Sequence, residues 1–231
     1  MCSLGQENQL PLSDLTSTLH TDQLKREIRG LWWPLRIARA IRREMVAGGI
    51  YGIQWGDPDV WTPLRFIRDR YVVPFVKPEH TALDIGCGGG RWTRQLLGFR
   101  RVYAVDYYED LLVEFRKSFR RYKHVTPIKN NGTDFPGVAP QSVDYILSFG
   151  CFGHINQGLI NGYLGNIKAI LKPGGNAVIH YSDKNKVMAQ GSGFSDNTPE
   201  QMRALVQGHG FKILEEDTTT MWNGAIVHFT V

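Results

Sequence analysis

The stretch Ala82-Leu83-Asp84-Ile85-Gly86-Cys87-Gly88-Gly89-Gly90-Arg91-Trp92 decides how this chain folds. A short apolar run contains one acid, and four glycines follow within five residues before a helix-like segment begins. Strand, glycine loop and helix in this order bring backbone close to a nucleotide-like ligand in α/β folds. A dinucleotide site needs glycines at positions 1, 3 and 6, and position 6 counted from Gly86 is Arg91. The carboxylate of Asp84 repels phosphate and suits a ligand that carries an amine and a positive centre.

Beyond this loop, strand-like and helix-like segments alternate, which predicts a parallel sheet with crossover helices. The patterns predict strands near residues 81–85, 101–105, 124–128, 143–148, 175–181, 211–217 and 224–230. They predict helices near residues 91–98, 108–121, 157–171 and 198–208.

The N-terminal part has a different pattern. Residues 1–22 are polar without a firm period, residues 23–48 look helical with a break near Pro34, and residues 59–72 predict another helix. We expect residues 1–76 to form an arm and a helical cap on the sheet, and residues 77–231 to form the main domain. Residues 1–76 are too few to form a separate hydrophobic core of their own.

Composition limits the class of protein. A chain of 231 residues with 42% apolar residues suits one domain with a substantial core. No apolar run approaches the ~20 residues that cross a bilayer, and the first residues lack a signal-peptide pattern. Three cysteines without metal-ligand spacing indicate a reducing compartment. We therefore expect a cytoplasmic protein with no membrane partner and no bound metal.

The net charge is +5, and basic residues concentrate in residues 25–43 and 91–123. A nucleic-acid binder can show this pattern. In the first stretch, however, apolar residues interleave with the basic ones, as on the buried stripe of an amphipathic helix. We therefore favour a solvated basic helix face over a nucleic-acid partner.

The motif Asp84-x-Gly86-x-Gly88-x-Gly90 resembles the first motif of class I methyltransferases that use S-adenosylmethionine. Further segments resemble later motifs of the family, in family order and over roughly residues 80–231. These segments are 102–106, 130–135, 143–150 and 171–179. The resemblance implies a three-layer α/β sandwich with a seven-stranded, mostly parallel, Rossmann-like sheet. It also implies S-adenosylmethionine as cofactor and S-adenosylhomocysteine as product.

The resemblance also assigns the cofactor-binding residues. Asp84, Gly86, Gly88 and Gly90 would surround the methionine end, where side chains would block the ligand. Asp106 would accept hydrogen bonds from both ribose hydroxyls, although it could also cap the following helix.

Other assigned residues would lie along the rest of the cofactor. Tyr107 would pack on the adenine ring. Asp134 would accept from the adenine amine with Phe135 against the ring, although turn chemistry also explains Asp134. Ser148 and Phe149 end the fourth predicted strand and would complete the cofactor-binding set.

The segment Ser148–His154 should lie at the carboxyl edge of the sheet, where reacting groups gather. His154 is the candidate general base, because imidazole titrates near neutral pH; a packed or capping histidine is the alternative. The segment lacks the Pro-Pro motif of nucleic-acid amino-methylating enzymes, the proline before a cytosine-C5 cysteine, and the acid of metal-dependent catechol-type enzymes. We therefore expect metal-free transfer, with Cys151 as a packed thiol.

Acceptor contacts are expected from two places. His180 and Tyr181 follow the fifth predicted strand on the same edge, and Tyr51 and Trp55 lie on a connector that would cover the cofactor mouth. The expected reaction is methyl transfer to a hydroxyl of a small metabolite, for which a sugar or natural product is the first guess, by a monomer or homodimer. An N-methyltransferase of a small amine, an RNA methyltransferase and a non-catalytic cofactor-binding module remain alternatives.

Overall fold

The computed structural model describes residues 52, 55–191 and 193–231. The chain divides into two compact units, residues 1–47 and 48–231, and the description below concerns the second. Tyr51 and the predicted arm and helix within residues 1–48 lie outside the described residues.

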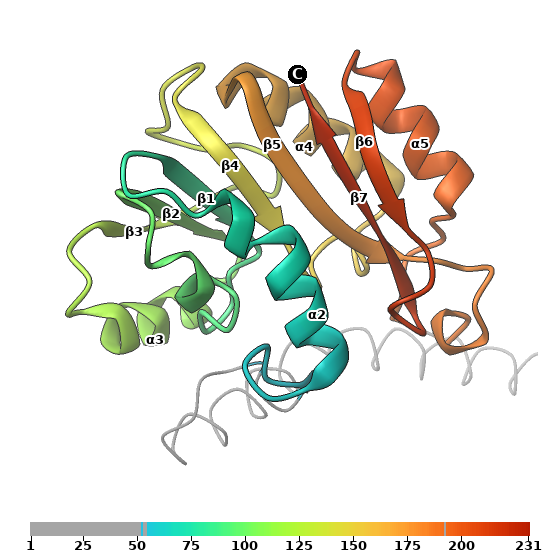
Figure 1. Cartoon of the computed structure of the whole chain (residues 1–231), viewed down its shortest axis with the longest axis horizontal. Helices are drawn as coiled ribbons and strands as arrows, with labels where there is room; N and C mark the ends of the chain where they lie inside the picture. The colour runs from blue at the N-terminus through green and yellow to red at the C-terminus, as the bar shows by residue number, and fades with distance from the viewer. Residues whose placement is uncertain (1–51, 53–54, 192) are drawn as a thin grey trace, which may run out of the picture. The chain divides into compact units, whose positions relative to one another are not determined.

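Seven strands form one sheet in the order β3-β2-β1-β4-β5-β7-β6 (Figure 1). The strands are β1 (Thr81–Ile85), β2 (Arg101–Asp106), β3 (Val125–Lys129), β4 (Val143–Ser148), β5 (Leu171–Ser182), β6 (Lys212–Asp217) and β7 (Gly224–Thr230). Strands β1 to β5 pair in parallel, and β7 runs antiparallel to both β5 and β6. The predicted seven-stranded, mostly parallel sheet is confirmed.

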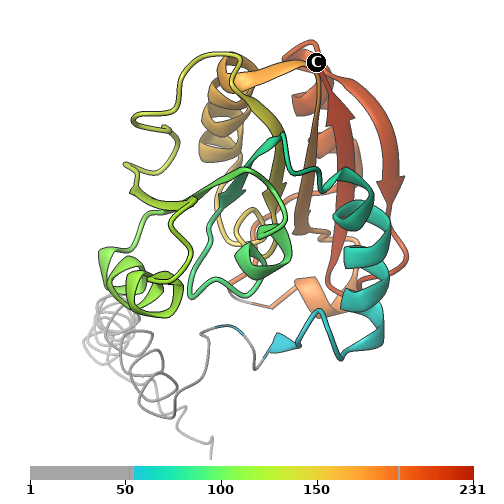
Figure 2. The ribbon, with the colours of Figure 1, turned by 60° about the vertical axis from the view of Figure 1, so that its left-hand side comes forward.

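Helices cover both faces of this sheet (Figure 2). The helices are α2 (Thr62–Tyr71), α3 (Glu109–Phe119), α4 (Gln157–Ile170) and α5 (Pro199–Gly208), with the short 3-10 helices η2 (Val73–Phe75), η3 (Thr93–Leu96) and η4 (Val187–Ala189). One apolar cluster joins α4 and α5 to one face, and a second joins α2, η3 and α3 to the other. The three-layer sandwich therefore has a separate core on each side of the sheet.

Two elements differ from the sequence-based prediction. The helix expected over 91–98 is only the 3-10 turn η3, Thr93–Leu96. This short connection must return along the length of β1, about 17 Å at 3.3 Å per residue, and a 3-10 turn rises further per residue than an α-helix. Strand β5 begins at Leu171, before Pro173, because Leu171 already pairs with Val143 across a register shift.

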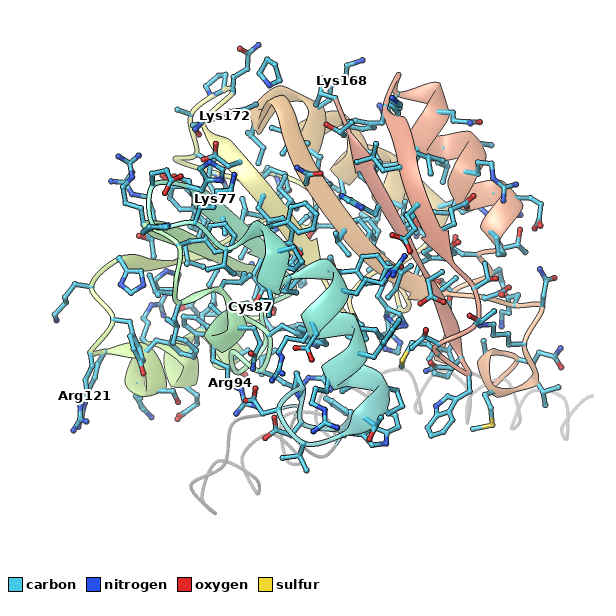
Figure 3. All side chains as sticks on the ribbon, viewed as in Figure 1. Lys77, Cys87, Arg94, Arg121, Lys168 and Lys172 are labelled. Atoms are coloured by element: carbon cyan, nitrogen blue, oxygen red, sulfur yellow. The ribbon has the colours of Figure 1, made fainter. Side chains whose placement is uncertain are left out.

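The strand order creates the place for a ligand. Strand β1 has β2 on one side and β4 on the other, so the chain leaves the sheet in opposite directions at the carboxyl ends of β1 and β4. Open α/β sheets bind ligands in the crevice at such a switch point. In Figure 3, Cys87 and Arg94 lie toward this carboxyl edge, whereas Lys168 and Lys172 lie at the opposite edge.

Candidate functional site

The glycine loop after β1 is held in a backbone conformation that other residues rarely adopt. Gly86, Gly88 and Gly90 have φ angles of 72°, 53° and 95°. A Cβ on Gly86 would lie 2.5 Å from the Cβ of Cys151, and a Cβ on Gly90 would overlap the Phe119 ring. The glycines therefore let the loop pass between the segment after β4 and helix α3.

Asp106 ends β2 and anchors this loop. Its Oδ2 accepts from the backbone N–H of Gly88 at 2.8 Å, and its Oδ1 accepts from that of Tyr108 at 2.9 Å. Burial raises the pKa of this carboxyl, although the backbone N–H groups around it act in the opposite direction. Each carboxylate oxygen keeps further acceptor capacity, so two ligand hydroxyls can still bind here.

Asp84 lies fully buried behind the same loop. Its Oδ2 accepts a 2.6 Å hydrogen bond from the Thr93 hydroxyl, which ties η3 to the end of β1. Burial, with the negative charge of Asp106, raises the pKa of Asp84 to about 7, although Thr93 and the cation of Arg91 lower it. Both carboxyl groups are buried and the pKa of each is raised, so a cationic ligand beside them would favour their ionised forms.

A second set of residues flanks the glycine loop on the side of β3. A Cβ built on Gly132 would lie 3.9 Å from the side chains of both Tyr107 and Leu159. Tyr107 is 52% exposed and lies beneath the Lys129 ammonium, which is 4.4 Å from its ring centroid. Leu159 is 38% exposed at the start of α4. The partly exposed side chains of Tyr107 and Leu159 therefore both lie close to Gly132.

The remaining residues expected around the adenine make contacts within the protein. Asp134 Oδ1 accepts from the backbone N–H of Asn131 at 2.7 Å, the turn arrangement that was the alternative. Phe135 is buried, with its ring centroid 5.9 Å from that of Tyr163. The neighbouring Asn130 is buried, and its Oδ1 has no partner, whereas its Nδ2 donates to the Tyr163 hydroxyl.

The end of β4 carries a stack of rings. Ser148 is fully buried, and its hydroxyl donates to the Ile85 carbonyl at 2.9 Å, which fixes the ends of β4 and β1 together. Phe149 lies 4.4 Å from the Trp92 ring and 4.3 Å from the His180 ring, with an angle of 13° to the latter. Phe149 thus joins the glycine-loop side of the edge to β5.

His180 is 6% exposed, and neither of its ring nitrogens has a hydrogen-bond partner within the described part of the chain. Burial, together with the positive charges of Arg91, His154 and Lys186, lowers the pKa of His180 to about 3, so its ring is neutral near pH 7. Tyr181 points to the other face of β5 and is fully buried in the core with α5. Because neighbouring strand residues face opposite ways, β5 brings His180 to Phe149 but takes Tyr181 away. We therefore leave Tyr181 out of the candidate acceptor site.

His154 is exposed and is held by the segment that precedes α5. Its Nδ1 lies 2.6 Å from the carbonyl oxygen of Gly193, and its ring stacks on Phe194 at 5.3 Å. A carbonyl only accepts, so Nδ1 carries a proton, and in the neutral form of the ring Nε2 is the acceptor. A hydrogen bond from Ser195 N–H to the Gly153 carbonyl, at 2.8 Å, fixes the same two segments. His154 is therefore an oriented imidazole with a free acceptor nitrogen at Nε2.

Arg91 was missing from the predicted site. Its guanidinium donates to the backbone carbonyls of Trp55 and Gly56, both at 3.1 Å, and lies 5.8 Å from the Phe149 ring centroid. Arg91 thereby ties the backbone at Trp55 and Gly56 to the glycine loop. Its position directly after Gly90 was the signal that could have singled it out.

The comparisons with known proteins agree with this geometry. Residues 82–175 match a family model described as a methyltransferase domain. No match was found among curated proteins. The PH0226 protein from Pyrococcus horikoshii OT3 has a similar structure, with a TM-score of 0.64 and 16% identity over 78% of this chain and 96% of that one.

Two further solved structures have the same fold. One is an S-adenosylmethionine-dependent methyltransferase from Clostridium acetobutylicum ATCC 824, with a TM-score of 0.61 and 14% identity over 72% of this chain and 89% of that one. The other is the glycopeptide N-methyltransferase MtfA complexed with S-adenosylmethionine, with a TM-score of 0.57 and 14% identity over 72% and 85% of the two chains.

Residues 82–175 thus match a methyltransferase domain, and the described unit has the fold of solved S-adenosylmethionine-dependent methyltransferases. The residues present fit that cofactor. Tyr107 and Leu159 offer apolar surface beside Gly132 for a ring, Asp106 has acceptor capacity for hydroxyls, and the buried Asp84 and Asp106 favour a cation.

Proposed function

We propose that this protein transfers the methyl group of S-adenosylmethionine to a hydroxyl group of a small metabolite, with His154 as general base. The observation that carries the proposal is the hydrogen bond from His154 Nδ1–H to the Gly193 carbonyl. It leaves Nε2 as a proton acceptor at the edge of the sheet where the cofactor site lies. A hydroxyl needs such a base, whereas a neutral amine does not.

The cofactor supplies a methyl group that is already activated by its positive sulfur. The chain's own residues hold and align it. We assign the ribose hydroxyls to Asp106, the adenine ring to the apolar side chains of Tyr107 and Leu159 beside Gly132, and the methionine end to the glycine loop with Asp84 behind it. Asp134, Phe135, Ser148 and Phe149 support the walls of this site. Alignment in a dry site supplies much of the rate enhancement.

The acceptor would lie between His154, the Phe149–His180 stack and the connector with Tyr51 and Trp55. Neutral His180 has one donor and one acceptor nitrogen that no described residue satisfies, and we assign them to a polar substrate, although both nitrogens are buried in this structure. This pairing of an aromatic ring with hydrogen-bonding groups favours a sugar or a hydroxylated natural product.

Cys151 supports no alternative chemistry. Burial, with the negative charges of Asp106 and Asp84, raises the pKa of its thiol to about 12, so a thiolate nucleophile is not available near neutral pH. Cys87 and Cys151 are unpaired thiols, in keeping with a protein that works in a reducing compartment such as the cytoplasm.

Methylation of an amine is the second candidate, and the similarity of fold to a glycopeptide N-methyltransferase favours it. In that case Nε2 of His154 would only bind the substrate, and removal of the imidazole would leave the chemical step largely intact.

Calorimetric titration with S-adenosylmethionine, S-adenosylhomocysteine and NAD tests the cofactor assignment. We expect the two adenosyl compounds to bind and NAD not to bind. Asp106→Ala should weaken the binding of both adenosyl compounds more than tenfold, which corresponds to about 1.4 kcal/mol. Asp110→Ala, at an exposed acid in the first turn of α3, is the matched control. Binding of NAD alone would contradict the proposal.

A further inference from the structure

A basic surface lies outside the candidate site, where α3 ends and β3 begins. Residues 116–123 read Arg-Lys-Ser-Phe-Arg-Arg-Tyr-Lys, so five of these eight residues are Lys or Arg and none is an acid. The start of β2 adds two adjacent arginines. The exposed residues of this surface, which we call the Arg100–Lys123 patch, are Arg100, Arg101, Arg120, Arg121, Tyr122 and Lys123.

Backbone contacts bring the two segments of the patch together, although α3 separates them in the sequence. Val102 pairs with Val125 in the β2–β3 ladder, and the Val102 N–H donates to the His124 carbonyl at 3.0 Å. Arg101 and Lys123 therefore lie beside the same end of this ladder. Since β3 is the last strand on its side of the sheet, the patch lies at a sheet edge.

The turn that carries the other cations is also held in place. The Tyr122 N–H donates to the Phe119 carbonyl at 2.9 Å, and the Val125 N–H donates to the Tyr122 carbonyl at 3.0 Å. Phe119 packs beside the glycine loop, since a Cβ on Gly90 would overlap its ring. The patch is thus presented on backbone that the sheet and the loop fix. Figure 3 shows Arg121 extending outward from the end of α3.

The charges of the patch are not compensated by acids. Within residues 55–191 and 193–231, none of its five Lys and Arg side chains forms an ion pair. The two cations that precede the patch on α3 differ, because Arg116 pairs with Glu109 at 2.6 Å and Lys117 pairs with Glu114 at 2.5 Å. Uncompensated cations on one surface attract a partner that carries several negative charges.

The residue types indicate which polyanion fits. Four of the five cations are arginines, whose planar fork donates two parallel hydrogen bonds to a phosphate. Tyr122 lies within the basic run and is 42% exposed, and a ring among cations suits the stacking of an unpaired base. An acidic protein needs no such ring, and an anionic bilayer favours aliphatic side chains or tryptophan, which the patch lacks.

We propose that the Arg100–Lys123 patch binds single-stranded nucleic acid, with its cations on successive phosphates and the Tyr122 ring against a base. The patch shares no residue with the sites assigned to the cofactor and the acceptor, so the proposal does not depend on the proposed function. It revises the expectation of a solvated basic helix face, which was argued from residues 25–43. In the second stretch, the basic run continues past the end of α3 at Phe119 and gathers with the start of β2.

Fluorescence anisotropy of the full chain with a labelled poly(U) RNA tests the phosphate contacts. For single strands, the logarithm of the association constant falls with the logarithm of salt by about 0.7 for each phosphate contacted. Arg120→Gln with Arg121→Gln should therefore reduce this slope by about 1.4 and weaken binding at low salt at least about tenfold. Arg65→Gln with Lys212→Gln is the matched control, because it removes the same charge from exposed positions on α2 and β6.

Tyr122→Leu tests the base contact. We expect about fivefold weaker binding of poly(U) and an unchanged salt slope, because the variant loses a stacking ring but no charge. Leucine keeps an apolar side chain against Phe119, whose ring centroid is 5.8 Å from that of Tyr122. Thermal melting of each variant separates loss of the contact from loss of folding.

Three outcomes would overturn the proposal. The first is no binding of poly(U) at low salt. The second is an Arg120/Arg121 variant that binds like the parent or no worse than the control variant, because RNA held elsewhere on the chain, or by net charge alone, does not depend on the patch. The third is competition by polyglutamate as strong as that by poly(U), with binding that Tyr122→Leu leaves unchanged, which would assign the patch to an acidic protein.

Discussion

The two halves of the carboxyl edge are built in different ways. The cofactor half, on β1 and β2, is held mainly by backbone: three glycines with positive φ, and a carboxylate of Asp106 that accepts from two backbone N–H groups. The acceptor half, on β4 and β5, is held mainly by side chains, through the Phe149–His180 stack and the His154–Phe194 stack.

This difference explains how each half can change. Backbone anchors depend on glycine and on an acid at a strand end, so they tolerate few residues. Side-chain stacks can be repacked with rings of other sizes, which alters the shape of the acceptor pocket without moving the cofactor. The fold therefore keeps one cofactor while its acceptor side remains variable.

The largest predicted effect concerns His154. His154→Ala should lower kcat for a hydroxyl acceptor by about 10² to 10⁴, because the base is lost, while the affinity for S-adenosylhomocysteine stays unchanged. The measurement is the rate of S-adenosylhomocysteine formation, with His209→Ala, at a half-buried histidine bonded to Asn161, as control. An unchanged rate would move the reaction to an amine acceptor.

Gly90→Ala should break the cofactor half. The new Cβ would overlap Phe119 at a φ of +95°, so we expect a loss of about 3 kcal/mol in the free energy of unfolding. Gly137→Ala is a sharp control, because its φ is +80° but no atom lies within 4 Å of the added Cβ. Urea denaturation measures both variants. Equal losses would show that close packing at Gly90 contributes nothing.

Asp84 gives the cofactor half a pH dependence. Its pKa rises from 3.8 to about 7 on folding, so the folded state holds a proton that the unfolded state has lost between these values. The Asp84 contribution to stability is thus present at low pH and is lost as pH rises toward 7. Between pH 5.5 and 7, this loss is about 2 kcal/mol.

Asp84→Asn should remove this slope. His180 has the opposite effect, because its pKa falls on folding and its contribution is lost as pH decreases toward 3. The difference between parent and variant, measured by urea denaturation at pH 5.5 and pH 7, isolates Asp84. Parallel curves for the two proteins would contradict the raised pKa.

The smallest predicted effect tests the boundary between the halves. Phe149→Leu loses ring contacts with Trp92 and His180, so we expect a loss of about 1 to 2 kcal/mol in stability. Because the Phe149 ring is packed within the protein, affinity for S-adenosylhomocysteine should change less than about threefold, or 0.7 kcal/mol. A tenfold loss in calorimetry would place Phe149 in the cofactor half.

The sequence predicted most of the frame on which the candidate cofactor site rests. The strands, the glycine loop and Asp106 are local features: each depends on residues within a few positions, through the period of a strand, the φ freedom of glycine and the acid at a strand end. The same local signals predicted a helix over residues 91–98, where the structure has only η3. Local signals carry no information about the distance that the chain must cover between the end of β1 and the start of β2.

The rest was decided by tertiary structure. Nothing in the sequence around His154 indicates that Gly193 accepts from its Nδ1, since the two residues are 39 positions apart. Local sequence also gives no sign of the contact of Arg91 with Trp55 or of Leu159 beside Gly132. Nor does it show that His180 contacts Phe149 whereas Tyr181 is buried on the other face of β5. These contacts depend on how whole elements pack over the sheet, and packing of distant side chains is a property of the complete fold rather than of any segment.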